Sequence, residues 1–276
     1  MQVSSAWSPP SGTLGTLVAA AVLRAEALHP QRGAIERRAA AVATPPGFAM
    51  ALAGRTVAVI AEIKRRSPSR GQLAPELNAP DRAASYVAGG ASALSVLTEP
   101  DRFGGSLDDL REVSGAVAVP VLRKDFIVDP LQLYEARACG AAAALLIVRA
   151  LAPRQLNALV ASSRAAGLEL LVEVRDEREL DRALDAGALV IGVNNRNLET
   201  LEVDPGTVAR IIPRIPAGLI AVAESGVTSR RDAEAAAATG ADAILVGSTL
   251  SVASDGAAAV HTLSGVTRRA RGEQRR

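Results

Sequence analysis

The amino-acid sequence predicts an α/β fold, a (β/α)8 TIM barrel with an N-terminal helical extension. Eight short runs rich in Val, Ile, Leu and Ala recur about 20 to 36 residues apart, and segments of helical period lie between them. A Gly-Ala pair precedes four of the runs. We expect the strands at residues 57–60, 93–97, 119–122, 143–148, 168–174, 189–193, 219–223 and 243–246.

The first 50 residues read as the helical extension. Residues 1–12 are rich in Ser, Pro and Gly and are expected to fray. Residues 14–28 and 35–43 are rich in Ala, Arg and Glu, which favours helices, and residues 48–52 add one further turn. This extension is expected to cover either the bottom of the barrel or the rim of its active site. Residues 51–262 then form the barrel, and residues 263–276 read as a disordered, solvated basic tail.

Helical segments are expected between the strands at residues 107–113, 131–139, 153–166, 177–186 and 230–239. Gly90, Gly140, Gly187 and Gly240 each precede an Ala and a strand, and glycine just past a helix accepts the left-handed cap conformation. A doubly wound open sheet is the alternative fold. The first strand, however, is not followed by the glycine-rich loop of a dinucleotide-binding sheet.

Composition limits the classes of function. Apolar residues make up 49% of the 276 residues and aromatic residues only 2%, so the core must be built from Ala, Val, Leu and Ile. The net charge of +2, without aromatic residues among the basic ones, argues against nucleic-acid binding. We find no apolar stretch that would span a membrane and no secretory signal, and the single Cys139 allows no intrachain disulfide. A cytoplasmic protein, monomeric or weakly homo-oligomeric, is expected.

Polar side chains cluster where the predicted strands end. In a (β/α)8 barrel the carboxyl ends of the strands carry the active site. The third strand ends in Arg123, Lys124 and Asp125, and Glu173 lies on the fifth. Glu62 and Lys64 are two residues apart on the first strand and therefore point to the same side, whereas Arg123 alternates away from Lys124.

The turns after the last two strands suggest an anion site. Ser225-Gly226 and Gly247-Ser248 place small residues where backbone N–H groups can approach a ligand. The loops after strands 7 and 8 commonly bind phosphate in this fold, although both could be ordinary turns. A phosphorylated small molecule is therefore the expected partner.

Two lysines and several glutamates beside a phosphate site suit acid–base chemistry on a sugar phosphate. Lys124 can donate a proton and Glu173 can accept one. Burial and neighbouring charges would move their pKa values toward the working pH. The competing interpretation is that Glu62 and Lys64 form a salt bridge that only fills the barrel top.

These residues carry a family resemblance. The segment from Glu62 to Gly71, Glu-Ile-Lys-Arg-Arg-Ser-Pro-Ser-Arg-Gly, resembles the signature of the indole-3-glycerol phosphate synthase family. Leu-Arg-Lys-Asp-Phe at residues 122–126, Ile-Gly-Val-Asn-Asn-Arg-Asn-Leu at 191–198 and Glu-Ser-Gly at 224–226 resemble the family in the same order, as do 95–99 and 103–106. The match covers roughly residues 45 to 250.

The resemblance implies the activity. The family closes the indole ring of 1-(2-carboxyphenylamino)-1-deoxy-D-ribulose 5-phosphate, with loss of carbon dioxide and water, in tryptophan biosynthesis. Such an enzyme is a carboxy-lyase that uses neither a metal nor an organic cofactor. Lys124 aligns with the general acid that protonates the ribulose carbonyl oxygen, and Glu173 with the general base of the dehydration. Lys64 aligns with a lysine near the substrate carboxylate that has a further acid role.

The remaining site residues are also assigned by the resemblance. Glu62, Asn194 and Ser225 align with polar residues that hold the ribulose part and orient the catalytic pair. The other positions fall into a substrate-binding set of Arg196, Phe103, Phe126, Leu198 and Glu224, and a phosphate-binding set of Ser67, Gly226, Gly247 and Ser248. The rival functions are a sugar-phosphate isomerase such as phosphoribosylanthranilate isomerase, and a non-catalytic barrel that binds phosphometabolites or partner enzymes.

Overall fold

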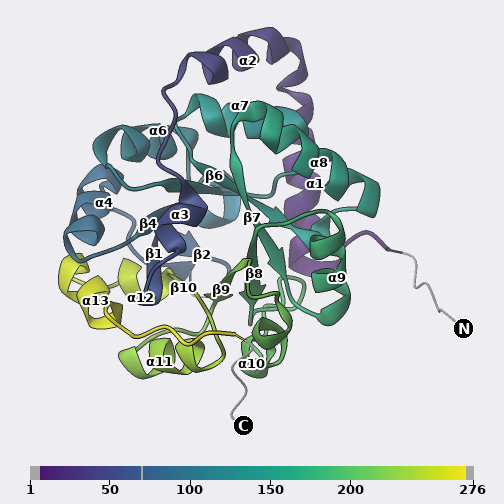
Figure 1. Ribbon diagram of the computed structural model, residues 1–276. Helices are drawn as coiled ribbons and strands as arrows, with labels where there is room; N and C mark the ends of the chain where they lie inside the picture. Colours follow the sequence, from purple (N-terminus) through teal and green to yellow (C-terminus); the bar gives the residue numbers. More distant parts are fainter. Residues whose placement is uncertain (1–6, 70, 272–276) are drawn as a thin grey trace, which may run out of the picture.

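Eight parallel strands close into a barrel in the computed structural model, which describes residues 7–69 and 71–271. Helices surround the strands on the outside (Figure 1). The (β/α)8 prediction is confirmed. Around the barrel the strands follow the order β1, β10, β9, β8, β7, β6, β5, β4. Their bounds are β1 Ala58–Ile63, β4 Ala93–Leu97, β5 Val121–Lys124, β6 Ala143–Ile147, β7 Glu169–Val174, β8 Val190–Asn194, β9 Ile220–Glu224 and β10 Ala243–Val246.

The strands are apolar on both faces because one face lines the barrel interior and the other packs under helices. All six residues of β1 are buried, and so are all residues of β4, β6, β8 and β10. The core is made of Ala, Val, Leu and Ile, with Tyr86 and Phe48 among its largest fully buried side chains. Aromatic scarcity therefore leaves a core of small and branched residues.

Most of the outer helices begin at a side-chain cap. Asn78, Ser106, Asp129, Asp176 and Ser229 each accept a backbone N–H in the first turn of the helix that follows. The helices after β1 are α4 Ala79–Ala88, α5 Pro100–Phe103, α6 Leu107–Ala116, α7 Pro130–Ala138, α8 Pro153–Ala166, α9 Glu177–Asp185, α10 Gly206–Ile211, α11 Arg230–Ala238, α12 Ser248–Ser251 and α13 Gly256–Leu263. Of these helices, α8, α10 and α12 have no side-chain cap. Short 3-10 turns, η2 (Val148–Ala150) and η3 (Ile212–Arg214), follow β6 and α10.

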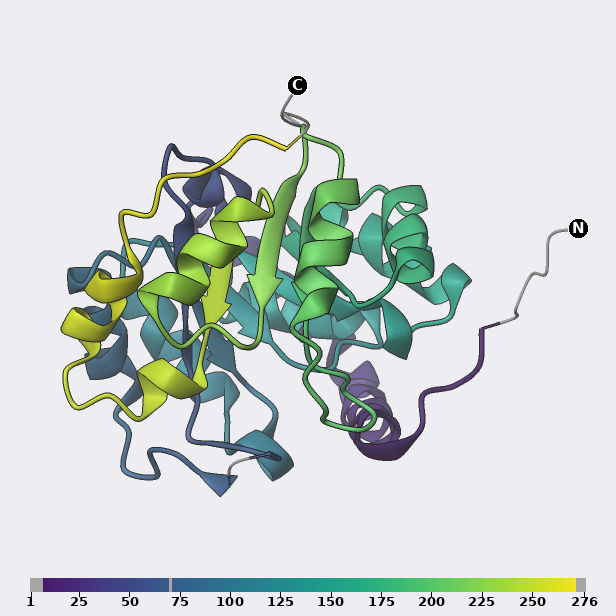
Figure 2. The ribbon, with the colours of Figure 1, turned by 90° about the horizontal axis from the view of Figure 1, so that it is seen from below.

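The N-terminal helices cover both ends of the barrel, so both placements considered from the sequence occur. These are α1 (Gly12–Glu26), α2 (Arg32–Ala41, after the 3-10 turn η1, His29–Gln31) and α3 (Phe48–Leu52). At the amino ends of the strands, the backbone N–H groups of Phe48 and Ala49 donate to the Glu169 carboxylate at the start of β7 (2.7 and 2.9 Å). At the opposite end, Arg24 of α1 pairs with Asp125 just after β5 (3.2 Å). Figure 2 shows α1 beside the carboxyl ends of the strands.

The C-terminal segment differs from the expected solvated tail. Residues 264–271 run along the amino ends of the strands, where the Arg271 side chain is 3% exposed and pairs with Asp242 (2.6 Å). Thr267 forms a β-bridge with Thr56, and Figure 2 shows the segment at the end opposite α1. The sequence predicts Arg268 and Arg271 to be solvated, because their partner Asp242 is not a neighbour in the sequence. Residues 1–6 and 272–276, also assigned to a frayed start and a disordered tail, lie outside the described residues.

No helix in the described ranges is long and apolar enough to cross a membrane.

Candidate active site

A cavity of about 350 Å³ opens at the carboxyl ends of the barrel strands. This volume is in the range of small-molecule sites. Every residue that the sequence predicted for the site lines this cavity: Glu62, Lys64, Ser67, Phe103, Lys124, Phe126, Glu173, Asn194, Arg196, Leu198, Glu224, Ser225, Gly226, Gly247 and Ser248. The strand register explains the convergence, because Lys124 is paired with Leu97 and Glu224 with Asn194 at the strand ends.

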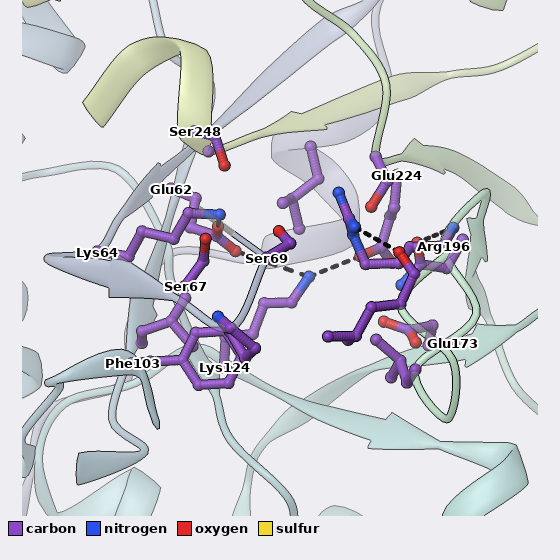
Figure 3. Close-up of a pocket in the computed structure, with 18 of the residues that line it drawn as sticks. Glu62, Lys64, Ser67, Ser69, Phe103, Lys124, Glu173, Arg196, Glu224 and Ser248 are labelled. Carbon is purple, nitrogen blue, oxygen red and sulfur yellow. Dashed lines mark hydrogen bonds and ion pairs between the residues drawn. The ribbon is translucent and has the colours of Figure 1, made fainter. Parts of the chain in front are cut away.

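Lys124 lies at the centre of the charged group. Its Nζ is 2.7 Å from Glu224 Oε2 and 3.7 Å from Glu62 Oε2, and Figure 3 shows the ammonium between the two carboxylates. Burial by itself would lower the pKa of Lys124, but Glu224, Glu62 and Glu173 outweigh burial and raise that pKa. The side chain is therefore a fully charged ammonium at neutral pH.

Glu62 and Lys64 form the predicted pair on β1. Lys64 Nζ lies 2.7 Å from Glu62 Oε1, and the side chains are 12% and 5% exposed. Burial would raise the pKa of Glu62, but Lys64 and Lys124 together hold it below its usual value. Glu62 therefore stays ionised and binds both ammonium groups. The pair also lines the cavity, so a molecule bound there would contact it.

Glu173 has the opposite electrostatics. It stands on β7 with 4% exposure, and burial raises its pKa to about 8, helped by the nearby Glu224 and only partly opposed by Lys124 and a hydrogen bond with Asn194. The sequence predicts Lys124 and Glu173 at the same barrel mouth, as proton donor and proton acceptor. The structure gives Lys124 a closer partner, Glu224, from a strand 100 residues further along the chain. A carboxyl group with this pKa can gain or lose a proton near neutral pH.

Two glycines make room for these charges. A Cβ on Gly247 would collide with Glu62 Oε1 and lie 2.7 Å from Lys64 Nζ. A Cβ on Gly192 would collide with Glu224 Oε1. Gly192 was not among the predicted site residues, although a glycine inside a strand signals close approach by another group.

The loop after β9, which the sequence predicts to bind phosphate, has an uncommon backbone conformation. Ser225 has φ 62° and Gly226 has φ 91°, and the left-handed region is uncommon for a residue with a side chain. Asn195 holds this turn, since its Nδ2 donates to the Ser225 carbonyl (2.9 Å). Across the cavity, Ser67 is buried and its Oγ has no hydrogen-bond partner among the described residues. Strained backbone and unpaired buried hydroxyls are typical of ligand sites.

An apolar wall faces the charged side of the cavity. The rings of Phe103 and Phe126 lie 6.4 Å apart, centre to centre, at a tilt of 37°. Leu198 lines the same cavity, and Arg196 beside it donates from Nη1 to the Leu201 carbonyl (2.8 Å). An aromatic ring with an anionic substituent would find both a dry surface and a cation here.

Two arginines fix the segment that follows β1. Arg65 makes a bidentate pair with Asp109 at the start of α6 (2.5 and 2.8 Å), and Arg66 donates to the carbonyls of Pro100 and Asp101 (3.1 and 2.6 Å). The same segment contains a short antiparallel hairpin with two residues in each strand, β2 (Arg66–Ser67) and β3 (Gly71–Gln72), which the sequence did not predict. Arg70, in the quoted signature, lies outside the described residues.

Several lining residues were not predicted. Thr13 and Leu17 of α1 reach the cavity, which places the N-terminal extension at the site. Thr228 and Thr249, which follow β9 and β10, add hydroxyls to the cavity. Within the described ranges no group of three or more His, Cys, Asp or Glu side chains is arranged to hold a metal ion.

Solved structures share the fold. One is a 3-hexulose-6-phosphate synthase from Salmonella typhimurium, with a TM-score of 0.60, 16% identity and coverage of 75% of this chain and 97% of that chain. Another is a thiamine phosphate pyrophosphorylase from Pyrococcus furiosus, with a TM-score of 0.56, 18% identity and coverage of 76% and 94%. At this identity the likeness establishes the barrel alone.

Sequence comparison is more specific. A family model described as indole-3-glycerol phosphate synthase matches residues 18–263. The chain is 54% identical over 228 residues to indole-3-glycerol phosphate synthase 1 of Streptomyces coelicolor. The aligned residues cover 83% of this chain and 84% of the relative. It is 57% identical over 196 residues to the indole-3-glycerol phosphate synthase of Kineococcus radiotolerans, covering 71% and 72%. The chain belongs to the indole-3-glycerol phosphate synthase family.

Proposed function

We propose that this protein is an indole-3-glycerol phosphate synthase, a carboxy-lyase that closes the indole ring of 1-(2-carboxyphenylamino)-1-deoxy-D-ribulose 5-phosphate in tryptophan biosynthesis. The observation that carries the proposal is the Lys124 ammonium, held between Glu224 and Glu62 at the mouth of a cavity with an anion loop on one side and an apolar wall on another. We expect the protein to work in the cytoplasm, as a monomer or weak homo-oligomer.

Substrate binding would use the three surfaces of the cavity. The phosphate binds at the turns of Ser225-Gly226 and Gly247-Ser248, with Ser67 Oγ as a further donor. The anthranilate ring packs on Phe103, Phe126 and Leu198, and its carboxylate lies near Arg196 and Lys64. Glu62, Asn194 and Ser225 orient the ribulose hydroxyls. In this pose the carbonyl carbon to be attacked lies beside Lys124.

Lys124 acts as the general acid of ring closure. As the ring carbon attacks the ribulose carbonyl, negative charge builds on its oxygen, and the ammonium donates a proton to it. The raised pKa of Lys124 keeps the proton available at neutral pH, while Glu224 and Glu62 fix the direction of the Nζ–H bonds. Loss of carbon dioxide then restores the aromatic ring.

Glu173 acts as the general base of the dehydration. It removes a proton from the carbon attached to nitrogen while the hydroxyl leaves as water, with Lys64 as a further acid. Its pKa of about 8 makes the ionised form a strong base for a carboxylate. Burial and Glu224 raise that pKa and therefore increase the basicity of Glu173.

Indole fluorescence tests the assignment. Purified protein with the carboxyphenylamino deoxyribulose phosphate should give rising indole fluorescence, and Lys124→Ala and Glu173→Gln should each lower kcat/KM by at least about 10²–10⁴-fold while remaining folded. Arg102→Ala is the matched control, because Arg102 is an exposed cation on α5 outside the cavity.

Each contrary result has a distinct meaning. Wild-type protein that forms no indole product would refute the function, and phosphoribosylanthranilate should then be tried for the isomerase activity. Near-normal rates in both variants would refute the two roles. A collapse of activity in Arg102→Ala would show that loss of any nearby cation suffices.

A further inference from the structure

A second, smaller cavity of about 120 Å³ lies beside the active site. Glu173 lines both cavities, together with Ile147, Arg196 and Leu198. The outer part of the side cavity is formed by Arg149 and Glu199, a pair 2.9 Å apart whose side chains are 29% and 21% exposed. The volume is large enough for several water molecules, and the lining offers them polar partners. The buried Glu173 carboxyl therefore has a polar side route toward solvent.

Glu179, in the first turn of α9, faces the same side cavity. It is 9% exposed, and its Oε2 accepts the Arg175 backbone N–H at 2.8 Å. Its own N–H donates to Asp176 Oδ1 at 2.8 Å, so the residue also completes the helix cap. Capping uses one carboxylate oxygen. It does not explain why a second buried acid stands beside the catalytic carboxyl.

The charges around Glu179 are mixed. Burial raises the pKa of Glu179 to about 7, Asp176 adds to that effect, and Arg149 and Arg182 oppose it. Glu179 in turn raises the pKa of Glu173. The charged groups around Glu179 are Glu173 from β7, Arg149 from η2, Arg175, Asp176 and Arg182 from α9 and the turn before it, and Arg196 and Glu199 from the loop after β8.

The proposed reaction requires proton exchange with solvent. The ribulose carbonyl oxygen gains one proton at ring closure, and the hydroxyl gains a second as it leaves as water. The carbon attached to nitrogen gives up one proton, and the carboxylate leaves as carbon dioxide without any. One proton is therefore taken up overall in each turnover, at a time when the substrate fills the main cavity.

We infer that Glu179 is a positioning residue of this reaction, which shares the Glu173 proton through water in the side cavity and links that carboxyl to solvent. A proton leaves the Glu173 carboxyl for a water molecule, and the water passes a proton to a Glu179 oxygen; the reverse sequence returns it. The inference rests on the proposed function only for the direction in which the proton moves during turnover. The coupling of the two carboxyls does not depend on turnover.

The first test follows Glu173 in the free protein. With ¹³C-labelled glutamate carboxyls, the Glu173 titration should shift to lower pH by roughly half to one unit in Glu179→Gln, since one like charge is lost. Glutamine still accepts the Arg175 N–H, so the cap and the melting temperature should be retained. Glu177→Gln is the matched control, because Glu177 lies on the same turn but pairs with Arg210 and Arg214 outside both cavities. An unchanged Glu173 titration would overturn the inference, whatever the wild-type activity.

The second test uses turnover. In Glu179→Gln the ascending limb of the kcat/KM profile should move to lower pH by the same amount, and kcat should fall with KM unchanged. Glu179→Asp should restore much of the wild-type profile, and Glu177→Gln should match wild type. A Glu179→Gln profile identical to wild type would leave Glu179 as a helix cap only and would overturn the inference. Wild-type protein without product would instead refute the proposed function, and the carboxyl titration would still decide the coupling.

Discussion

Both ends of the barrel bury pairs of opposite charges, but the groups that surround these pairs differ. At the amino ends, Asp242 is 1% exposed, pairs with Arg268 and Arg271, and also accepts the Ala221 backbone N–H (2.7 Å). Arg271 further donates to the carbonyls of Gly240 (2.6 Å) and Leu219. At the carboxyl ends, Lys124 and its carboxylates instead border a cavity.

The ion pairs at the two ends of the barrel differ in what surrounds them. At the amino ends, Asp242 and Arg271 form hydrogen bonds with backbone groups in β9 and just before β9 and β10. These bonds hold the C-terminal segment in place. Both ends leave buried polar atoms without a hydrogen-bond partner among the described residues: Arg271 Nε and Asp242 Oδ1 at the amino ends, the latter in an ion pair with Arg268, and Glu224 Oε1 and Ser67 Oγ at the carboxyl ends. Of these residues, Glu224 and Ser67 line the cavity, where a ligand can reach them. Buried polar groups without partners are costly in free energy, and a bound ligand would supply those partners. The two groups should therefore respond in opposite ways to mutation.

The largest effect is expected at the amino ends. Asp242→Ala should lower the free energy of unfolding by about 3–5 kcal/mol, because Arg271 would be left buried without its anion. Urea unfolding measures this loss. Asp242→Asn keeps an acceptor for the Ala221 N–H and should lose less. The folded fraction of both variants should keep wild-type kcat/KM, and a selective loss of kcat would contradict the division between the ends.

At the carboxyl ends, Glu173 should lower the free energy of unfolding by an amount that depends on pH. The Glu173 pKa is about 8 in the folded protein against an ordinary 4.5, so below pH 4.5 both states are protonated and there is no cost. Between these values the unfolded chain ionises while the folded protein keeps its proton. The unfolding free energy therefore falls as pH rises, and the cost is complete above the folded pKa.

Glu173→Gln isolates this term. Between pH 5 and 9 the wild type should lose on the order of a few kcal/mol more unfolding free energy than the variant, at roughly 1.4 kcal/mol per pKa unit. Urea unfolding at a series of pH values gives the difference between the two curves. Parallel curves would mean that Glu173 ionises normally in the folded protein.

The sequence predicted the repeating pattern of the barrel better than its element ends. The runs at 93–97 and 243–246 coincide with β4 and β10, and residues 153–166 with α8. The run at 119–122 begins two residues before β5, which starts at Val121 and extends to Lys124. Apolar patterning detects burial, whereas the strand ladder continues into polar residues at the mouth. The β2–β3 hairpin was missed because each of its strands is two residues long and contains no apolar residue, so it leaves no periodic pattern in the sequence.

The site followed from the sequence because strand ends converge in a closed barrel. Pairings across the barrel did not, since Lys124 and Glu224 are 100 residues apart and Arg271 lies 29 residues after Asp242. The same limit explains the error about the C-terminal segment. Charged residues look alike in a sequence whether they are solvated or buried against a distant partner.

Glu224→Gln should have the smallest free-energy effect of the three changes. Lys124 keeps Glu62 as a second anion at 3.7 Å, and glutamine retains an oxygen for Nζ, so the unfolding free energy should change little. The ammonium would be less firmly oriented and Glu173 would lose a like charge. We expect kcat/KM to fall by about 10²-fold, equivalent to roughly 2.7 kcal/mol. The ascending limb of the kcat/KM profile against pH, which reports the ionisation of Glu173, should move to lower pH. Stopped assays across pH measure both. If Glu224→Gln lowered the unfolding free energy as much as Asp242→Asn, the carboxyl-end charges would be structural too, because the buried Lys124 ammonium would then depend on Glu224 for its stability.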